Sequence, residues 1–222
     1  MAGRLKNLLA VMLIGFAAVA LAAVYWGALV SDTLLRRGDN PRLVEAERAL
    51  QRGAILATDG TPLAFSTQAG RSPSGLPIME RRYPHPETAG LIGYYSLTYG
   101  VGGIEGAYDA ELRGSDRRGD GETLLSGILH QPPVGSDIRL TLDVALQKAL
   151  ADAFGTRRGA GVVLEAPTGA LRAMVSLPGF NPEMLDSTFD ALTGDPGAPL
   201  LNRAIQGRYQ PGGALQSVIL AA

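Results

Sequence analysis

A run of 23 residues from Leu8 to Val30 carries no charged side chain. As an α-helix this run would be roughly 35 Å long. That length exceeds the hydrocarbon core of a bilayer, which is about 30 Å thick. Tyr25 and Trp26 fall near the far end of the run, where interfacial aromatic residues are common. The sequence therefore predicts a single transmembrane helix over residues 8–30.

The residues that flank this run predict its orientation. Arg4 and Lys6 precede it, and basic residues favour the cytoplasmic side of a membrane. Residues 1–7 are therefore expected to form a cytoplasmic tail, with the rest of the chain outside the cytoplasmic membrane. A cleaved signal peptide is the alternative, since Ala20-Leu21-Ala22 offers small residues at a usable spacing. The apolar part of a signal peptide usually has only about 7–15 residues, which favours an uncleaved anchor.

The composition excludes several classes of function. The chain has 222 residues, a net charge of −1 and no cysteine, which excludes disulfides and thiol chemistry. It carries no basic region of the kind that binds nucleic acid. The two histidines, His85 and His130, match no metal-ligand spacing, so neither a metal nor a cofactor is expected. Lysine occurs only at Lys6 and Lys148, against 18 arginines.

The first half after the anchor reads as rich in β-structure. Residues 43–52 indicate a short helix or an extended lead-in. Residues 52–64 alternate in polarity around Asp59-Gly60, a pair that tolerates the positive φ of a tight hairpin turn. Residues 68–77 are rich in Gly, Ser and Pro and are predicted to form a loop.

The second half predicts a strand, a helix and a hairpin in that order. Residues 138–142 form a strand-like run that ends at Asp143, a residue suited to capping the N-terminus of a helix. Apolar residues then recur at helical spacing as far as Phe154. Two apolar runs, 160–164 and 170–175, are joined by Glu165-Ala166-Pro167-Thr168-Gly169 and indicate a hairpin.

The last segment carries the most specific pattern in the chain. Asn202-Arg203-Ala204 is followed by Gln206-Gly207-Arg208-Tyr209-Gln210-Pro211-Gly212. This order resembles the N-R-A and Q-G-x-Y-x-P-G elements that precede the catalytic S-x-x-K motif of penicillin-binding transpeptidases. The resemblance implies that position 213 is that of the nucleophile and position 216 that of the base.

Earlier motifs resemble class B penicillin-binding proteins and occur in the family's order. Residues 52–64 resemble its R-G-x-I-x-D signature, and Arg82-Tyr83-Pro84 resembles its R-x-Y-P element. Gly103-Ile104-Glu105 with Tyr108-Asp109 resembles its G-[IL]-E-x-x-Y-D element. The resemblance implies an α+β chain with a β-rich pedestal over residues 31–137 and the first part of a transpeptidase domain over residues 138–222. The pedestal is expected to close its own core.

Glu105 lies among four glycines, at positions 100, 102, 103 and 106. A phosphate-binding G-x-G-x-x-G would require glycine at position 105, which is Glu105. The glycines are therefore predicted to form turns. Glu105 is predicted to be a structural hydrogen-bond acceptor of the pedestal.

The side chains that carry the family's chemistry are absent from this chain. Position 213 is Gly213, which has no nucleophilic atom, and position 216 is Gln216, whose neutral amide is no base near neutral pH. Ser217 would face about 100° away from position 216 on a helix. The S-x-N and K-T-G motifs of the family do not occur, since Lys6 precedes Asn7 and Lys148 precedes Ala149. No catalytic residue is assigned.

Three functional hypotheses follow. The first is a non-catalytic, membrane-anchored relative of these proteins in peptidoglycan synthesis or cell division, which binds other membrane proteins of the cell-wall apparatus and peptidoglycan strands. The second is a fragment of an active D,D-transpeptidase whose remaining motifs lie beyond residue 222. It is favoured because residues 218–222 are apolar and uncapped, as in a core helix cut short. The third is a decayed gene product.

Overall fold

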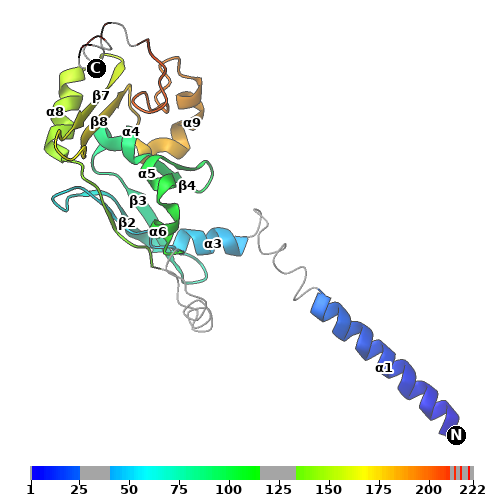
Figure 1. The fold of residues 1–222 in the computed structure, drawn as a ribbon. Helices are drawn as coiled ribbons and strands as arrows, with labels where there is room; N and C mark the ends of the chain where they lie inside the picture. Colours follow the sequence, from blue (N-terminus) through cyan, green and yellow to red (C-terminus); the bar gives the residue numbers. More distant parts are fainter. Residues whose placement is uncertain are drawn as a thin grey trace. The chain divides into compact units, whose positions relative to one another are not determined.

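The computed structural model of the chain describes residues 2–25, 41–115 and 134–210, together with Gly213, Gln216 and Leu220 (Figure 1). The chain divides into two units, Met1–Glu47 and Arg48–Ala222. Helix α1 (Ala2–Val24) belongs to the first unit. Helix α3 (Pro41–Ala49) begins in the first unit and ends in the second.

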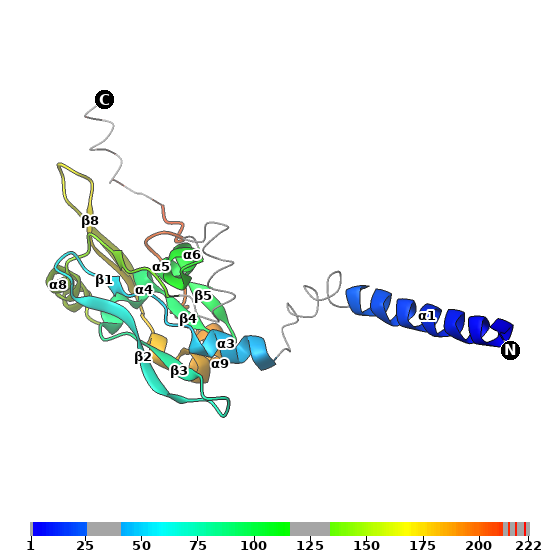
Figure 2. The same cartoon turned by 90° about the horizontal axis from the view of Figure 1, so that it is seen from below.

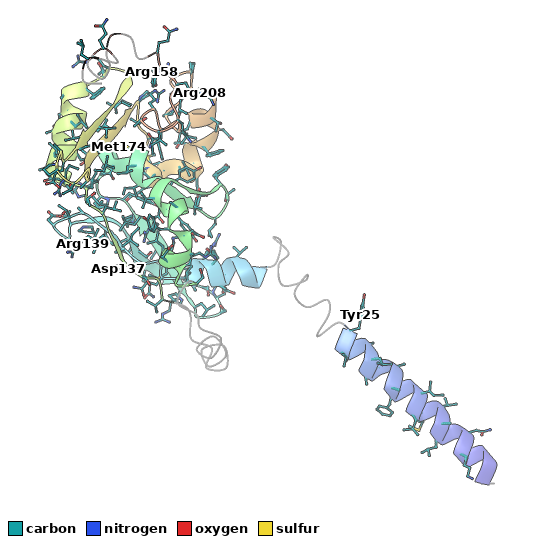
Figure 3. The ribbon with its side chains drawn as sticks, viewed as in Figure 1. Tyr25, Asp137, Arg139, Arg158, Met174 and Arg208 are labelled. Carbon is teal, nitrogen blue, oxygen red and sulfur yellow. The ribbon has the colours of Figure 1, made fainter. Side chains whose placement is uncertain are left out.

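Helix α1 begins before the predicted transmembrane run, and residues 26–30 of that run lie outside the described residues. Tyr25 lies at its C-terminal end (Figure 3). Its large apolar side chains are solvent-exposed, with Leu13 at 61%, Phe16 at 71% and Leu21 at 70%. Among the helices in the described part of the chain, none combines the length and the apolar character needed to span a membrane.

A four-stranded sheet in the order β3-β2-β1-β6 organises the second unit. Its strands are β1 (Ile55–Leu56), β2 (Pro62–Arg71), β3 (Pro77–Arg82) and β6 (Ile138–Arg139). Strands β1, β2 and β3 pair antiparallel in sequence order, and β6 joins the free side of β1 in parallel. The sheet therefore links the beginning of the second half of the chain to the first half.

The hairpin between β1 and β2 is confirmed, and its turn has the expected chemistry. Gly60 adopts φ = +89°, a conformation open to glycine because it has no Cβ atom. The backbone nitrogen of Thr61 and its hydroxyl both donate to the carboxylate of Asp59, at 2.9 and 2.8 Å. Local hydrogen bonds of this kind fix a tight turn without help from the rest of the fold.

The predicted loop over residues 68–77 is wrong. Strand β2 runs on to Arg71 and β3 begins at Pro77, so that only residues 72–76 form the turn of a long ribbon (Figure 2). Gln68 pairs with Met79 and Gly70 with Ile78, with a shift in register between the two pairs. A β-bulge of this kind accommodates a glycine within a strand. Backbone pairing therefore outweighs the loop-like composition.

The segment after β3 is built from short elements. They are η2 (Pro86–Thr88), α4 (Ala89–Ile92), β4 (Tyr94–Ser96), β5 (Gly100–Gly102), α5 (Gly103–Ala107) and α6 (Asp109–Arg113). The turn-forming role of the glycines is confirmed, because Gly100 and Gly103 have φ values of +81° and +62°. A Cβ atom on Gly103 would lie 2.7 Å from the Cα atom of Gly93, so this close approach of two backbones requires glycine.

The second half contains α8 (Val144–Phe154), β7 (Gly159–Leu164), β8 (Leu171–Leu177), η3 (Pro182–Met184) and α9 (Leu185–Gly194). The predicted hairpin is the two-stranded sheet β7-β8, and α8 packs against β8 (Figure 1). The N-cap at Asp143 is confirmed, since its carboxylate accepts a hydrogen bond from the backbone nitrogen of Leu146 at 3.0 Å. The α+β fold class is thereby confirmed.

The main hydrophobic core is shared between the two halves. Ile55, Leu63, Ile92 and Leu112 are fully buried in it, and so is Leu142 from the second half, at 1% exposure. Leu171 and Met174 of β8 pack against the same cluster. The expectation that the pedestal closes its own core is therefore wrong, because part of the apolar cover comes from residues beyond 137.

Candidate functional site

Glu105 is the centre of a buried charge cluster in the first half of the chain. Its side chain has no solvent exposure, and it accepts hydrogen bonds from Arg52 Nη2 at 3.0 Å and Arg81 Nε at 2.7 Å. Tyr83 Oη donates to the same carboxylate at 3.3 Å. The predicted structural role of Glu105 is therefore confirmed, since the cluster connects α5 to β3 and to Arg52 in the segment between α3 and β1.

The surroundings in this cluster shift the pKa values of Arg52 and Tyr83. Burial alone would lower the pKa of Arg52, but the charge of Glu105 and the hydrogen bond to Asp109, at 2.6 Å, leave that pKa above its ordinary value. The guanidinium of Arg52 also lies 4.5 Å from the centre of the Tyr95 ring, a favourable position for a cation. Burial raises the pKa of Tyr83 far above that of a free tyrosine. Arg52 therefore stays charged and Tyr83 stays protonated near neutral pH, and both hold neighbouring elements together.

The sequence analysis placed Arg82 in the R-x-Y-P element. In the structure the buried arginine is Arg81. Arg81 is 9% exposed and bound to Glu105, while the side chain of Arg82 is 42% exposed and pairs with Glu80 at 2.7 Å. The spacing of the motif, with one residue between Arg and Tyr, was the signal that could have identified Arg81. Successive side chains of a strand point to opposite faces, which explains the contrast.

Asn202 and Arg203 attach residues 202–210, which resemble the elements before the family's S-x-x-K motif, to the rest of the unit. Asn202 Nδ2 donates to the backbone oxygen of Gly90 in α4 at 2.6 Å. Arg203 is 2% exposed, and its guanidinium donates to the backbone oxygens of Gly197 and of Ala198, the latter at 3.1 Å. Ser176 Oγ in β8 accepts from the backbone nitrogen of Arg203 at 3.0 Å. Asn202 and Arg203 therefore hold this segment in place through hydrogen bonds that the sequence analysis did not predict.

Positions 213 and 216, where the family has its serine and lysine, lie close together in space. Gly213 and Gln216 are both exposed, and a Cβ atom built on Gly213 would lie 3.8 Å from Gln216 Oε1, at ordinary contact distance. Among the described residues, no atom lies closer to this Cβ position, so a side chain at position 213 would lie beside that of Gln216. Gly213 supplies no hydroxyl and Gln216 no titratable group. Ser217 lies outside the described residues.

In the part of the chain that the structure describes, histidine and acidic side chains form no recognisable metal centre. His85 lies before η2, where its Nδ1 is 3.3 Å from Glu87 Oε1, and His130 lies outside the described residues. Within the described ranges, no group of three or more histidine, aspartate and glutamate side chains could hold a metal ion.

Gln147 is a further residue that sequence reasoning missed. Its side chain is fully buried in α8. Its Nε2 donates to the backbone oxygens of Glu87 and Met174 at 2.8 and 2.7 Å, and its Oε1 accepts from the Met174 nitrogen at 2.8 Å. Figure 3 labels Met174 inside this unit. One amide thus joins η2, α8 and β8. The sequence signal that could have identified it is a glutamine on the same helical face as the apolar Leu150 and Phe154.

The chain is similar in sequence to known penicillin-binding proteins and peptidoglycan transpeptidases. Residues 52–138 match the penicillin binding protein A dimerisation domain. Peptidoglycan D,D-transpeptidase PbpA of Mycolicibacterium smegmatis is 36% identical over 206 residues, which cover 86% of this chain and 41% of that protein. Peptidoglycan D,D-transpeptidase MrdA of Escherichia coli is 33% identical over 143 residues, which cover 59% of this chain and 23% of that protein.

The fold of the chain is also similar to that of a solved penicillin-binding protein. Penicillin-binding protein A from M. tuberculosis, as an imipenem acyl-enzyme complex, superposes with a TM-score of 0.68 at 33% sequence identity. The superposition covers 79% of this chain and 42% of that one. The chain therefore spans less than half the length of the relatives that it matches. The motifs, the fold and these similarities agree, and the chain belongs to the class B penicillin-binding proteins.

Proposed function

We propose that this chain takes part in peptidoglycan synthesis as a membrane-anchored protein that binds its partners and carries out no acyl transfer itself. The observation that carries the proposal is the pair Gly213 and Gln216, at the positions where the family has its serine and lysine. The expected partners are membrane proteins of cell-wall synthesis or division and peptidoglycan strands. The likeness to the D,D-transpeptidases PbpA and MrdA supports the setting in cell-wall synthesis.

The family's mechanism explains why the residues at positions 213 and 216 determine whether the chain can carry out acyl transfer. In the family mechanism, a serine oxygen attacks the carbonyl of a D-Ala-D-Ala peptide or a β-lactam, and a lysine on the next turn of the helix helps to move its proton. Loss of a serine nucleophile typically lowers the rate by about a millionfold. Gly213 removes the attacking oxygen, and Gln216 removes the proton acceptor beside it.

The N-terminal segment supports the membrane setting of the proposal. The uncharged run over residues 8–30 is long enough to cross a bilayer as a helix. Helix α1 covers residues 8–24 of that run, and its described large apolar side chains are exposed, among them Leu13, Phe16 and Leu21. Exposed apolar surface of this extent is costly in water and favourable in lipid. The cytoplasmic membrane is the compartment that fits this segment.

The test is a direct assay of peptide chemistry. The purified full chain is incubated with an N-acylated peptide that ends in D-Ala-D-Ala, and free D-alanine is measured over time. The proposal predicts that the native chain releases D-alanine no faster than heat-denatured protein does. It also predicts that the native chain binds to sedimented cell-wall sacculi. Release that needs the native protein would contradict the non-catalytic role.

A second candidate function is that of the N-terminal part of a longer, active D,D-transpeptidase. The observation that favours it is the small coverage of the relatives, 41% for PbpA. The exposure of Val162 and Leu164 on β7, at 45% and 58%, agrees with it, because apolar strand residues are normally covered. S-x-N and K-T-G codons downstream of residue 222 would support this candidate. Gly213 and Gln216 would still lack the family's chemistry.

A further inference from the structure

Helix α4 contacts two parts of the molecule at once. Its apolar residues Leu91 and Ile92 are buried in the main hydrophobic core, at 8% and 0% exposure. The same core contains Ile55 and Leu63 of the four-stranded sheet. The helix also packs against β8 of the second half (Figure 1). It therefore connects the core to the β7-β8 hairpin.

Gly90 of α4 contacts the second half through its backbone. Its oxygen accepts a hydrogen bond from Asn202 Nδ2 at 2.6 Å. A Cβ atom on Gly90 would lie 3.2 Å from the Cβ atom of Ser176 in β8, which is closer than ordinary van der Waals contact. The absence of a side chain at position 90 thus allows α4 to approach β8 this closely.

Ser176 in turn holds the backbone on both sides of the peptide bond that follows Asn202. Its hydroxyl donates to the backbone oxygen of Leu201 and accepts from the backbone nitrogen of Arg203, both at 3.0 Å. Ser176 is 6% exposed. A displacement of this side chain by α4 would therefore be felt directly by residues 201–203.

Asn202 holds the residues that follow it. Its Oδ1 atom accepts from the backbone nitrogen of Ala204 at 3.1 Å, and its backbone oxygen accepts from the nitrogen of Gln206 at 2.8 Å. The same side chain donates to Gly90. One amide thus links α4 to the turn formed by residues 202–206.

We propose that α4 couples the main hydrophobic core to residues 202–210, so that a displacement of α4 in the core changes how firmly this segment is held. Energetic coupling travels through chains of packed side chains and hydrogen bonds such as this one. Ile92 and Gly90 are then positioning residues for the segment that, in the family, precedes the catalytic serine. The proposal goes beyond the binding role given above and does not depend on it.

The experiment measures hydrogen exchange at the backbone amides of residues 202–206 in the full chain in detergent. All five amides donate hydrogen bonds, so local opening of the segment speeds their exchange. Ile92→Val removes one methylene group from α4 in the core and should speed this exchange about threefold or more. Ile55→Val makes the same deletion at an equally buried residue of β1 and should leave it at the native rate.

A second pair of variants tests the contact at Gly90. Gly90→Ala places a Cβ atom against Ser176 and should also speed exchange at residues 202–206. Gly194→Ala adds the same methyl group to α9, where no described atom outside that helix lies within 4 Å of it. This control should leave the exchange unchanged.

A double variant tests the path between α4 and the segment. Because Asn202 links Gly90 to residues 202–206, Ile92→Val should have a smaller effect in an Asn202→Ala background than in the native chain. An effect of the same size in both backgrounds would overturn the proposal. So would equal exchange in Ile92→Val and Ile55→Val, or in Gly90→Ala and Gly194→Ala. None of these results depends on D-alanine release, so the non-catalytic role stands or falls separately.

Discussion

Arg52 and Glu105 form an ion pair at 3.0 Å across 53 positions of the chain, with side chains 2% and 0% exposed. Arg81 holds the other oxygen of the same carboxylate at 2.7 Å. A single acidic group thus compensates part of the charge of two buried arginines. Because unpaired buried charges are costly, this carboxylate is the group whose loss should matter most for stability.

The first prediction concerns that carboxylate. Glu105→Gln should lower the free energy of unfolding by about 3–5 kcal/mol, because it leaves buried guanidinium charge without its partner. The matched control is Glu80→Gln, since Glu80 pairs with Arg82 in an exposed position, and its effect should stay below about 1 kcal/mol. Urea unfolding followed by circular dichroism measures both. Equal losses in the two variants would contradict the account of the cluster.

The second prediction concerns alkaline pH. Burial raises the pKa of Tyr83 above that of a free tyrosine, about 10. The folded state therefore keeps the proton while the unfolded state releases it. This contribution to stability is complete below about pH 10 and falls above it, by about 1.4 kcal/mol per pH unit.

Tyr83→Phe removes this contribution. The difference in unfolding free energy between the native chain and the variant should be constant from pH 7 to 9, on the flat side of the free tyrosine pKa of about 10. It should shrink at higher pH. Urea titrations at a series of pH values measure it, and parallel curves over the whole range would show that Tyr83 ionises as freely in the folded state as in the unfolded one.

The third prediction concerns Gln147, the amide that joins η2, α8 and β8. Gln147→Met keeps much of the side-chain volume but leaves the backbone oxygens of Glu87 and Met174 and the nitrogen of Met174 without their partner. Each unsatisfied buried group costs about 1–3 kcal/mol. Lys148→Met, at the next and exposed position, should change stability by less than about 0.5 kcal/mol. A small effect of Gln147→Met in the same urea assay would refute this role.

The sequence predicted the elements that depend on local chemistry. The turn at Asp59-Gly60 and the cap at Asp143 each use hydrogen bonds within a few residues, so a short stretch contains the information. The order of the motifs gave the family. The identity of positions 213 and 216 needed no structure, because the chemistry follows from the residue types.

Several of the contacts that the sequence did not predict join residues far apart in the chain. Asn202 binds Gly90 across 112 positions, and Gln147 binds Glu87 across 60. The β2–β3 ribbon extended into residues predicted as a loop, because the partner strand supplied its hydrogen bonds. Leu142 completed the core of the first half for the same reason. Such pairings depend on the whole fold, and no local pattern encodes them.

The fourth prediction concerns topology and tests the proposed membrane setting. Protease added to intact spheroplasts should digest the chain after residue 30, whereas residues 1–7 should be protected. The physical reason is the uncharged run with Arg4 and Lys6 before it. A tag at the N-terminus and an antibody to the second unit report the two sides. Full protection of the second unit, or a mature chain that begins near Ala23, would contradict the uncleaved anchor.

The last prediction tests the central claim, that this chain carries no acylating serine at its family position. A β-lactam labels its target by acylation of that oxygen, which Gly213 lacks. Purified protein incubated at length with a fluorescent penicillin should show no covalent adduct, and its intact mass should stay unchanged. Gly213→Ser with Gln216→Lys should not restore labelling in the 222-residue chain, because S-x-N and K-T-G are absent from it. A stable penicillin adduct on the unmodified chain would contradict the account, and peptide mapping of that adduct would identify the nucleophile.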